Sequence, residues 1–340
     1  MKKWKIMISG FGSVGYHVAG FLEARREHYR QKYGADVQLV AVCKSRSGIY
    51  DPEGLTLTEI EEFRNGTVTD KESAEYTGAG FVAQAGIDVL IEAGPTNFEH
   101  GEPGMSYLRS ALQKHIHAIA ISKGALVLDY QGLSTLAKQH HVMLKISGAT
   151  AAALPTIDLL EYNLAGCEVK SMSGIFTGTT NFILTKMVDE QLSFEEAVAL
   201  AQQMGIAEPN PQFDIDGWDT ACKMTILANA AFETAVQLKD VKREGIGPIT
   251  SDELAQYREQ NVVPKLIGSI VRTEQGVTVQ VKKELLPVDH PLAQVKGTTK
   301  AVYVETDVMG DFLVVGGKSD PRAAAAAALK DLEHILQKHN

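Results

Sequence analysis

The sequence predicts an α/β protein built from a Rossmann-type nucleotide-binding domain and an α+β catalytic and dimerisation domain. Strand and helix patterns alternate through the first part of the chain, and a glycine-rich turn joins the first strand to the first helix. Both features are typical of a parallel sheet that binds a dinucleotide. From Gly148 the chain becomes rich in small residues and the alternation ends. We therefore expect a nucleotide-binding domain over 1–147, completed by a C-terminal helix over 320–340, and a second domain over 148–319.

Length, charge and cysteine usage limit the class of protein. A chain of 340 residues, 44% of them hydrophobic, fits two packed domains. The net charge of −9 makes nucleic acid and anionic membranes unsuitable partners, and no apolar run is long enough to span a bilayer. Cys43, Cys167 and Cys222 show no CxxC spacing, which favours a reducing cytoplasm and argues against a zinc site. We expect a cytoplasmic protein whose ligand is a small molecule.

The first predicted strand, WKIMIS, leads into a dinucleotide-binding turn. An amphipathic helix follows the turn, which consists of Gly10, Phe11, Gly12, Ser13, Val14 and Gly15. In such turns the first glycine allows the tight bend, the second lets a pyrophosphate approach the backbone, and the third lets helix and strand pack closely. The start of the helix adds N–H donors for phosphate oxygens. The alternative is a tight turn without a ligand, but the strand before and the helix after favour dinucleotide binding.

The end of the second strand indicates which dinucleotide is preferred. An NAD site usually carries an acidic residue here, which binds the ribose hydroxyls. Instead, the strand VQLVAVC is followed by Lys44, Ser45, Arg46 and Ser47. Two cations suit a ribose 2′-phosphate, so the sequence favours NADP, with NAD still possible. The alternative is a solvated basic loop that contacts no ligand.

Two further strands, over 87–94 and 116–122, end in polar residues. Thr96 follows the first and Lys123 follows the second. Ligands bind beyond the carboxyl ends of the strands in such sheets, so both residues are candidates for the cofactor crevice. The alternative for Lys123 is a solvated loop position.

Most of the ionisable residues of interest lie in one stretch, 201–223. It contains four carboxylates and one lysine, namely Glu208, Asp214, Asp216, Asp219 and Lys223. Repeated acids suggest a ligand with positive charge, such as a substrate ammonium. A calcium loop is a weaker explanation, because the glycine of DIDGWD comes too early for an EF-hand.

The same stretch joins two predicted helices. Pro209 and Pro211 exclude helix from the loop, and we expect Asp214 or Asp216 to cap the helix that follows. On that helix Asp219 and Lys223 are four residues apart and share a face. The simple interpretation is a weak surface ion pair, but the neighbouring residues of Lys223 are apolar, which favours a polar site.

The second predicted domain supplies a further candidate and a dimerisation surface. Gly178 and Thr179 stand in the segment GTTN, which suits a small polar ligand, although a helix start capped by Thr179 or Thr180 is the alternative. The segments TVQVKKELLP, KAVYVETDVMG and FLVVGG predict an antiparallel sheet, which favours a homodimer. Asp320 and Pro321 predict the start of the last helix.

These motifs resemble a known family. The segments SGIFTGTTNFIL, MGIAEPNPQFDIDGWDTACK and REGI (243–246) closely resemble the catalytic domain of homoserine dehydrogenase. ISGFGSVG, EAGPTN and ISKG resemble its nucleotide-binding part, and GGKSDPRAAAAAALKDL resembles its returning helix. The resemblance covers essentially the whole chain and implies a short form without the C-terminal regulatory domain of some members.

The resemblance implies NAD(P)-dependent interconversion of L-homoserine and L-aspartate 4-semialdehyde, in threonine and methionine biosynthesis. Lys123 and Lys223 correspond to proton-transfer or orienting groups at the reacting hydroxyl. The residues implied to hold the substrate's amino end and hydroxyl network, or to line its site, are Glu208, Asp214, Asp219, Gly178 and Thr179.

Two positions depart from the family pattern. Thr177 stands where the family usually has Asn or Ser, which is a mild change. Ser147 stands where the family usually has a Glu, in a segment that binds a monovalent cation largely through backbone carbonyls. The carbonyls near Thr150, Ala152 and Leu154 remain available to Na⁺, but with the carboxylate missing we expect at most a modest effect of Na⁺ or K⁺.

Two alternative functions fit the same scaffold. Another NAD(P)-dependent amino-acid or hydroxy-acid dehydrogenase would keep the glycine turn and prefer a different substrate. A non-catalytic NADP-binding sensor would bind cofactor without turnover, and the presence of Lys123, Asp219 and Lys223 argues against it.

Overall fold

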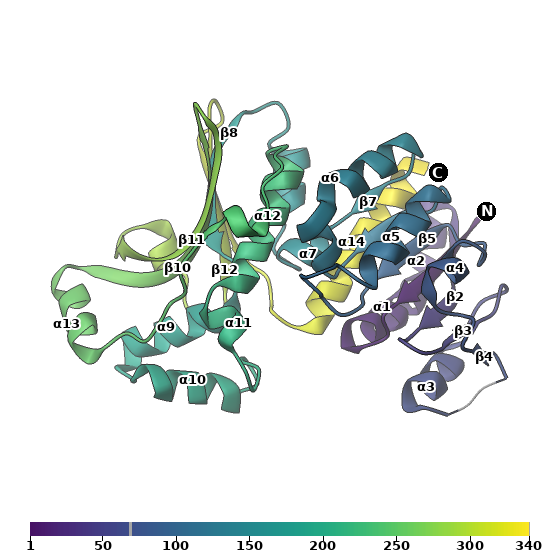
Figure 1. Cartoon of the computed structure of the whole chain (residues 1–340), viewed down its shortest axis with the longest axis horizontal. Helices are drawn as coiled ribbons and strands as arrows, with labels where there is room; N and C mark the ends of the chain where they lie inside the picture. Colours follow the sequence, from purple (N-terminus) through teal and green to yellow (C-terminus); the bar gives the residue numbers. More distant parts are fainter. Residues whose placement is uncertain (68–69, 340) are drawn as a thin grey trace. The chain divides into compact units, whose positions relative to one another are not determined.

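The computed structural model describes residues 1–67 and 70–339, and its contacts divide the chain into two compact units. The first unit comprises Met1–Ala152 with Asp320–Asn340, and the second comprises Ala153–Ser319. A parallel sheet in one unit and a second sheet in the other confirm the predicted α/β class (Figure 1). Within the described ranges, no helix has the length and apolar character needed to cross a membrane.

The first unit is built on a seven-stranded sheet in the order β4-β3-β2-β1-β5-β6-β7. In the order of the sheet, the pairs β2-β1, β1-β5, β5-β6 and β6-β7 are parallel. The edge strands β3 and β4 add the antiparallel pairs β2-β3 and β3-β4. The chain leaves β1 toward β2 and later returns to β5 on the other side, so the strand order reverses between β1 and β5. Ligands bind at such a point. The strands are β1 (Lys2–Ser9), β2 (Ala35–Cys43), β3 (Gly48–Tyr50), β4 (Glu72–Ser73), β5 (Val89–Glu92), β6 (His117–Ala120) and β7 (Leu144–Lys145).

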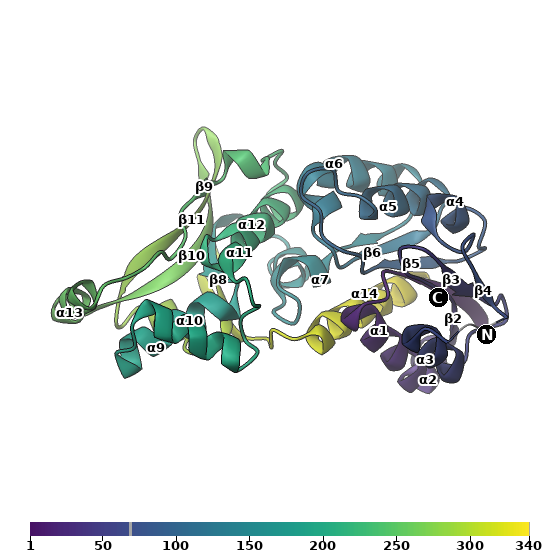
Figure 2. The same ribbon diagram turned by 60° about the horizontal axis from the view of Figure 1, so that its bottom comes forward.

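Helices cover both faces of this sheet (Figures 1 and 2). Successive side chains of a strand point to opposite faces, and β1 follows this rule: Ile6 and Ile8 join one apolar core, whereas Met7 joins another. The first core includes α1 and α14, and the second includes α4 and α5. The helices are α1 (Ser13–Ala24), α2 (Arg26–Tyr33), α3 (Leu57–Asn65), α4 (Gly78–Val82), α5 (Gly104–Gln113), α6 (Gly124–Gln139), α7 (Ser147–Thr150) and α14 (Pro321–His339).

The last helix, α14, starts as its sequence predicts. The Asp320 carboxylate accepts a hydrogen bond from the Ala323 amide at 2.8 Å, and Pro321 takes the first helical position, where a missing N–H costs nothing. The alanine run favours helix, and its small side chains allow α14 to pack against α1. Leu329 and Leu332 are fully buried there.

The second unit is built on a six-stranded sheet in the order β13-β12-β8-β10-β11-β9. Pairing is antiparallel except between β9 and β11. The central strand β10 was not predicted from the sequence, because Pro264 and Gly268 both disfavour a strand interior. Pro264 is tolerated because β8 pairs only with residues 268–271 of β10. The strands are β8 (Val169–Ile175), β9 (Lys242–Arg243), β10 (Val262–Thr273), β11 (Gly276–Pro287), β12 (Lys300–Thr306) and β13 (Asp311–Gly316).

Helix α12 packs against β10 and β11, and Gly268 allows the close approach. A Cβ at residue 268 would lie 2.8 Å from the Thr220 side chain, which leaves no room for one. The helical segments of this unit are α8 (Thr156–Asp158), η1 (Leu159–Asn163), α9 (Gly178–Glu190), α10 (Phe194–Gln203), α11 (Gln212–Ile215), α12 (Trp218–Ala231), η2 (Leu238–Asp240), α13 (Ser251–Glu259) and η3 (Pro291–Gln294).

The loop before α12 differs from its prediction. A short helix, α11, interrupts a loop that we expected to be non-helical, and it begins directly after Pro211. Asp216 ends α11 and does not cap α12; the residue before α12 is Gly217, in the left-handed conformation with φ 80°. A left-handed residue is readily supplied by glycine, so the chain turns sharply here and neither aspartate caps α12.

Candidate active site

The glycine turn after β1 has the geometry that a dinucleotide needs. Gly10 has φ 86°, and a Cβ there would lie 2.3 Å from the Gly94 nitrogen, so the loops after β1 and β5 touch. A Cβ on Gly15 would lie 2.4 Å from the Gly10 carbonyl oxygen. By contrast, a Cβ on Gly12 would meet nothing within 4 Å. The first and third glycines are therefore required by packing, and the second faces open space that suits a pyrophosphate.

The start of α1 fits the same ligand. Gly12 precedes the helix and offers no side-chain cap, so Ser13 and Val14 open α1 with backbone N–H groups for an anion. Phe11 is buried and stacks on Phe63, with ring centroids 6.2 Å apart. The aromatic contact holds the turn in place.

The two basic residues after β2 have different surroundings. The Lys44 amine donates to the carbonyl oxygens of Phe63 at 2.6 Å and Arg64 at 3.3 Å, at the end of α3. A cation there also complements the helix dipole. Arg46 is exposed. Lys44 thus has a structural partner that the sequence did not indicate, whereas Arg46 faces solvent.

Thr96 and Lys123 lie together at the carboxyl end of the sheet. The Lys123 amide donates to the Thr96 hydroxyl at 3.3 Å, and Lys123 immediately precedes α6. Gly124 packs closely on the same loop, since a Cβ there would lie 2.1 Å from the Asn97 carbonyl oxygen. The loops after β5 and β6 are therefore fixed to each other at the expected ligand crevice.

A residue that sequence reasoning missed, Glu92, supports both loops. It is 1% exposed at the end of β5. Its carboxylate accepts from the Gly94 amide at 2.8 Å and from the Ser122 hydroxyl at 2.5 Å. Burial raises the pKa of Glu92, while the hydrogen bonds from Ser122 and Gly94 act in the opposite direction. An acidic residue that ends an otherwise apolar strand, as in LIEAG, was the available signal.

In the second unit, Lys223 and Asp219 form an ion pair on α12. Lys223 Nζ lies 2.5 Å from Asp219 Oδ2, and the two side chains are only 14% and 13% exposed. Lys223 Nζ also donates to the Phe176 carbonyl oxygen at 2.8 Å, directly after β8. This geometry rules out the simple surface pair, because both partners are largely buried and the lysine is fixed by two acceptors.

Asp214 completes an acidic cluster around this pair. Burial raises the pKa of the Asp214 carboxyl, and the neighbouring Asp219 carboxylate raises it further. Thr179 and Lys223 act in the opposite direction, and the charge of Glu208 adds to the increase. The fold therefore brings together five predicted residues of this unit, and their charges leave an excess of acid over base.

The start of α9 forms one wall of the cluster. A Cβ on Gly178 would lie 2.9 Å from the Thr298 carbonyl oxygen, so the close approach requires glycine. Thr177 precedes the helix, and its hydroxyl lies 2.5 Å from that of Thr180. The hydroxyl of Thr179 donates to the Ile206 carbonyl oxygen at 3.3 Å. Neither Thr179 nor Thr180 caps α9, because Thr177 is the residue before the helix and it makes no side-chain cap hydrogen bond.

The contacts of Arg243, the first residue of the REGI segment, were not predicted from the sequence. Its guanidinium donates to the Asp216 carbonyl oxygen and lies 3.8 Å from the centre of the Trp218 ring. Ile246, in the same segment, donates its amide to the Ile215 carbonyl oxygen at 2.9 Å. The REGI segment thus supports the loop that carries the acids.

Two family models match the chain over both units. The model described as homoserine dehydrogenase matches residues 155–332, and the model described as the NAD binding domain of homoserine dehydrogenase matches residues 10–146. The chain belongs to the homoserine dehydrogenase family. It is an NAD(P)-dependent oxidoreductase that acts on a CH–OH group.

Relatives and solved structures agree with this assignment. A homoserine dehydrogenase of Methanocaldococcus jannaschii is 36% identical, over 97% of this chain and 98% of that protein. An NAD(+)-dependent homoserine dehydrogenase of Pseudomonas canavaninivorans is 31% identical, over 99% and 97%. The crystal structure of a homoserine dehydrogenase from Thiobacillus denitrificans is 27% identical, with a TM-score of 0.85, over 100% of this chain and 74% of that one.

Ser147 lies in the segment that the family resemblance implied as a monovalent-cation site, and its side chain contacts helix α14. The Ser147 hydroxyl donates to an Asp331 oxygen at 2.7 Å and accepts from Lys330 Nζ at 2.7 Å. The Ser147 hydroxyl is therefore already bound to two charged side chains of α14. Ala152 has a left-handed backbone, with φ 53°, and belongs to the first unit with Thr150. Leu154 belongs to the second unit, where its carbonyl oxygen already accepts an amide hydrogen bond at 2.9 Å.

Proposed function

We propose that this enzyme interconverts L-homoserine and L-aspartate 4-semialdehyde, with NADP preferred over NAD, in threonine and methionine biosynthesis. The observation that carries the proposal is the ion pair of Lys223 and Asp219, fixed against the Phe176 carbonyl oxygen and set in an acidic cluster. The pair offers a proton donor to the substrate oxygen, and the surrounding acids suit the substrate ammonium.

Lys223 handles the proton in this proposal. An ammonium has three donors, and two of those of Lys223 point at Asp219 and Phe176. The third is directed to the substrate oxygen, where it donates a proton as the aldehyde is reduced and receives it back as the alcohol is oxidised. The nicotinamide cofactor, when bound, exchanges the hydride. Lys123, in the first unit (the nucleotide-binding unit), is proposed as the second proton-transfer or orienting group.

The carboxylates hold the amino end of the substrate. The Asp214 and Asp219 carboxylates are close enough to repel each other, and a cation between them relieves the repulsion. The single ammonium of Lys223 does not balance Asp214, Asp219 and Glu208 together. A substrate ammonium supplies the missing positive charge, and Gly178 and Thr179 line the site beside it.

The cofactor proposal rests on the turn and the loop after β2. The turn residues Gly10–Gly15 and Thr96 would hold the dinucleotide, and Lys44 and Arg46 would face the ribose 2′-phosphate. Exposed Arg46 suits that role better than Lys44, because two carbonyl oxygens already bind the Lys44 amine. The Pseudomonas relative is named NAD(+)-dependent, so the preference must be measured.

An absorbance assay of L-homoserine oxidation tests the proposal. NADP and NAD are compared side by side, with other amino acids and hydroxy acids as substrates. We expect the highest kcat/KM for homoserine with NADP. A higher value with NAD would refute the cofactor preference, and turnover confined to another substrate would refute the function.

We also propose that a monovalent cation has at most a modest effect. Residue 147 is Ser where the family usually has a carboxylate, and its hydroxyl is already hydrogen-bonded to Asp331 and Lys330. Activity in buffer free of Na⁺ and K⁺ should stay close to that with either ion added. Complete dependence on one of them would show that backbone carbonyls suffice.

A homodimer is the proposed assembly. The edge strand β13 exposes Leu313 (42%) and Val315 (49%) on one face of the antiparallel sheet, and exposed apolar strand residues favour association. Sedimentation analysis should give the mass of two chains, and Leu313→Lys with Val315→Lys should shift it toward one.

A further inference from the structure

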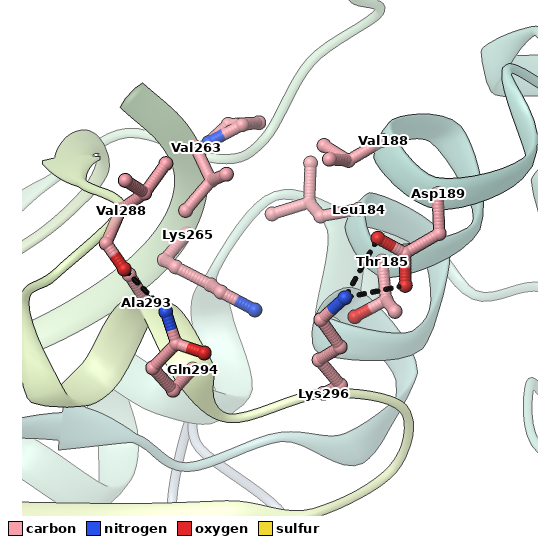
Figure 3. Close-up of a pocket in the computed structure, with 11 residues that line it drawn as sticks. Leu184, Thr185, Val188, Asp189, Val263, Lys265, Val288, Ala293, Gln294 and Lys296 are labelled. Carbon is pink, nitrogen blue, oxygen red and sulfur yellow. Dashed lines mark hydrogen bonds and ion pairs between the residues drawn. The ribbon is translucent and has the colours of Figure 1, made fainter. Parts of the chain in front are cut away.

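A pocket lies in the second unit, called the catalytic unit below, and its lining includes none of the residues proposed for catalysis. It is formed by the end of α9, the start of β10 and the segment around η3 (Figure 3). Its empty volume is about 510 Å³, including space open to solvent. Its apolar wall consists of Leu184, Val188, Val263, Val288 and Ala293.

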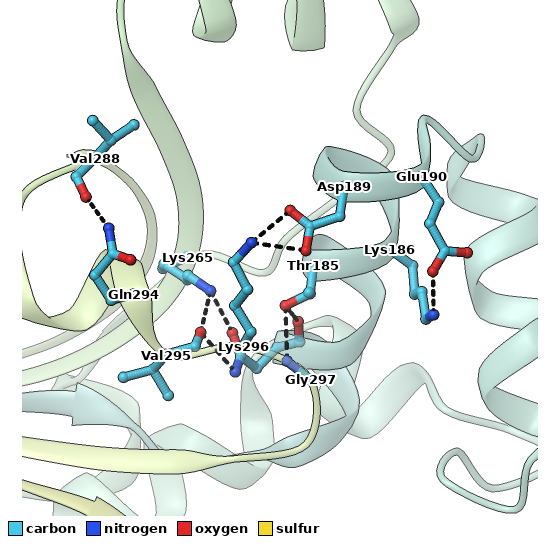
Figure 4. A network of polar contacts seen from close by, with 11 residues as sticks. Thr185, Lys186, Asp189, Glu190, Lys265, Val288, Gln294, Val295, Lys296 and Gly297 are labelled. Carbon is cyan, nitrogen blue, oxygen red and sulfur yellow. Dashed lines mark hydrogen bonds and ion pairs between the residues drawn. The ribbon is translucent and has the colours of Figure 1, made fainter.

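The unusual group in this pocket is Lys265, which is only 4% exposed. Its amine donates to the side-chain oxygen of Asn181 at 2.8 Å and to the carbonyl oxygen of Val295 at 2.5 Å (Figure 4). Both acceptors are neutral. Figure 3 shows the amine directed into the space between the pocket side chains. One of its three donors therefore remains for a ligand.

The charged neighbours of Lys265 do not neutralise it. Glu284 stands directly opposite on β11 but pairs with Lys282 at 3.5 Å. Asp189, on α9, binds Lys296 through both carboxylate oxygens, each at 2.9 Å. In the described part of the chain, Lys265 thus forms no ion pair of its own.

Burial has the expected effect on this amine. It lowers the pKa of Lys265 to about 8, with Lys296 acting in the same direction and Asp189 in the opposite one. A buried cation without a counter-charge favours the neutral form. An anion bound beside Lys265 would restore the charged form.

We propose that this pocket binds a small carboxylic acid anion with a short branched aliphatic chain. The carboxylate accepts the third hydrogen bond of Lys265, and the aliphatic chain packs against Val188 and Val263. Such charge-assisted hydrogen bonds are among the stronger ones. A doubly charged anion such as phosphate does not fit, because Lys265 is the one buried cation among the described residues that line the pocket and the wall is apolar. The Thr185 hydroxyl, which also lines the pocket, is occupied, since it donates to the Asn181 carbonyl oxygen and accepts from the Gly297 amide.

Two sources share this chemistry, namely a simple carboxylic acid and an α-amino acid. The Asp189–Lys296 pair distinguishes the two sources. It is partly exposed, at 39% and 58%, and exposed pairs are weak, so Asp189 can bind a ligand ammonium in place of Lys296. An amino acid would place its ammonium near Asp189 and bind more tightly than the acid alone. Equal affinity would identify the simple acid.

Methyl NMR of the full chain tests the proposal, with isovalerate and L-leucine as probes and isobutylamine as the control. We expect saturable shifts of the Leu184, Val188, Val263 and Val288 methyl groups with both carboxylates, and none with the amine. Affinity should fall as pH rises above about 8, by up to about tenfold per pH unit as Lys265 loses its proton. An absence of saturable shifts with both carboxylates overturns the proposal.

Three variants locate the site. Lys265→Met should weaken isovalerate at least tenfold by removing the cation. Val188→Phe fills the pocket and should do the same, so a poorly folding Lys265→Met still leaves a test. The matched control is Lys186→Met, on the same helix, because Lys186 pairs with Glu190 and does not line the pocket. It should bind as the wild type does; equal weakening in the control would refute the assignment to Lys265.

Discussion

Two lysines of the catalytic unit, the largely buried Lys223 and the fully buried Lys265, differ in the groups that surround their amines. Lys223 lies on a helix, where Asp219 one turn earlier supplies a counter-charge at 2.5 Å. Lys265 lies on a strand and has only neutral acceptors, from Asn181 and Val295. The helical repeat places residues four apart side by side, whereas the cross-strand neighbour of Lys265, Glu284, pairs elsewhere.

The difference assigns different chemistry to the two amines. The ion pair at Lys223 keeps a proton donor oriented beside an acidic cluster, which suits proton transfer at a substrate oxygen. Lys265 carries an uncompensated charge, and burial lowers its pKa to about 8, which suits recognition of an anion. Removal of each lysine should therefore affect different measurements.

The largest expected effect belongs to Lys223. Lys223→Ala should lower kcat by about 100- to 10,000-fold, the contribution of a positioned acid or base, and leave NADP affinity nearly unchanged. Lys223→Arg should not rescue it, because a guanidinium does not release its proton near neutral pH. Stopped-flow hydride transfer with titrated NADP binding measures both quantities.

Lys265→Met is the contrasting variant for the same assay, and it should keep most of its kcat because Lys265 is proposed to bind a ligand outside the active site. A near-normal kcat in Lys223→Ala, or an equal loss in both variants, would show that the two lysines do not differ as proposed.

The second prediction concerns stability and pH. The folded pKa of Lys265, about 8, lies below the unfolded value of about 10.4. Between these values the unfolded chain holds a proton that the native protein has released, so the contribution of Lys265 to stability rises with pH by up to about 1.4 kcal/mol per unit. It is smallest below pH 8, where the buried amine must stay charged.

Denaturant unfolding of the wild type and Lys265→Met at pH 7, 8, 9 and 10 checks this window, because other titrating groups cancel in the difference. The wild type should gain on the variant above pH 8. A difference that is constant with pH would mean that Lys265 stays charged in the folded protein.

Local sequence patterns predicted those parts of the molecule that depend on neighbouring residues. The turn from Gly10 to Gly15 and the Asp320 cap involve residues within a few positions, so their spacing carries the signal. The α/β class was predicted from the alternation of strand and helix patterns in the first part of the chain. The Asp219–Lys223 pair was predicted because both residues share one helix face.

Contacts between distant residues escaped prediction. The Phe176 carbonyl oxygen belongs to a residue 47 positions from Lys223. Every residue has a backbone carbonyl oxygen, so the residue type does not indicate this contact. Arg243 reaches the Asp216 carbonyl oxygen across 27 positions, again through the backbone. Strand β10 was missed because Pro264 and Gly268 weaken its pattern, although pairing with β8 and β11 stabilises it.

The smallest effect concerns a third lysine, Lys44, which sharpens the comparison from the nucleotide-binding unit. Like Lys265, Lys44 donates to two neutral acceptors, here the carbonyl oxygens of Phe63 and Arg64, but it is only partly buried. Arg46 beside it is exposed and available to a 2′-phosphate. Arg46→Ala should therefore raise the KM for NADP about tenfold, near 1.4 kcal/mol, and leave that for NAD nearly unchanged.

Lys44→Ala should act chiefly on stability, by about 1–2 kcal/mol, because it removes a charged donor from the end of α3. Steady-state kinetics with both cofactors, together with denaturant unfolding, separate the two roles. The double variant should combine the two losses. Equal effects of Arg46→Ala on NADP and NAD would show that the loop after β2 does not contact the 2′-phosphate, and a stable Lys44→Ala with weak NADP binding would assign that contact to Lys44 instead.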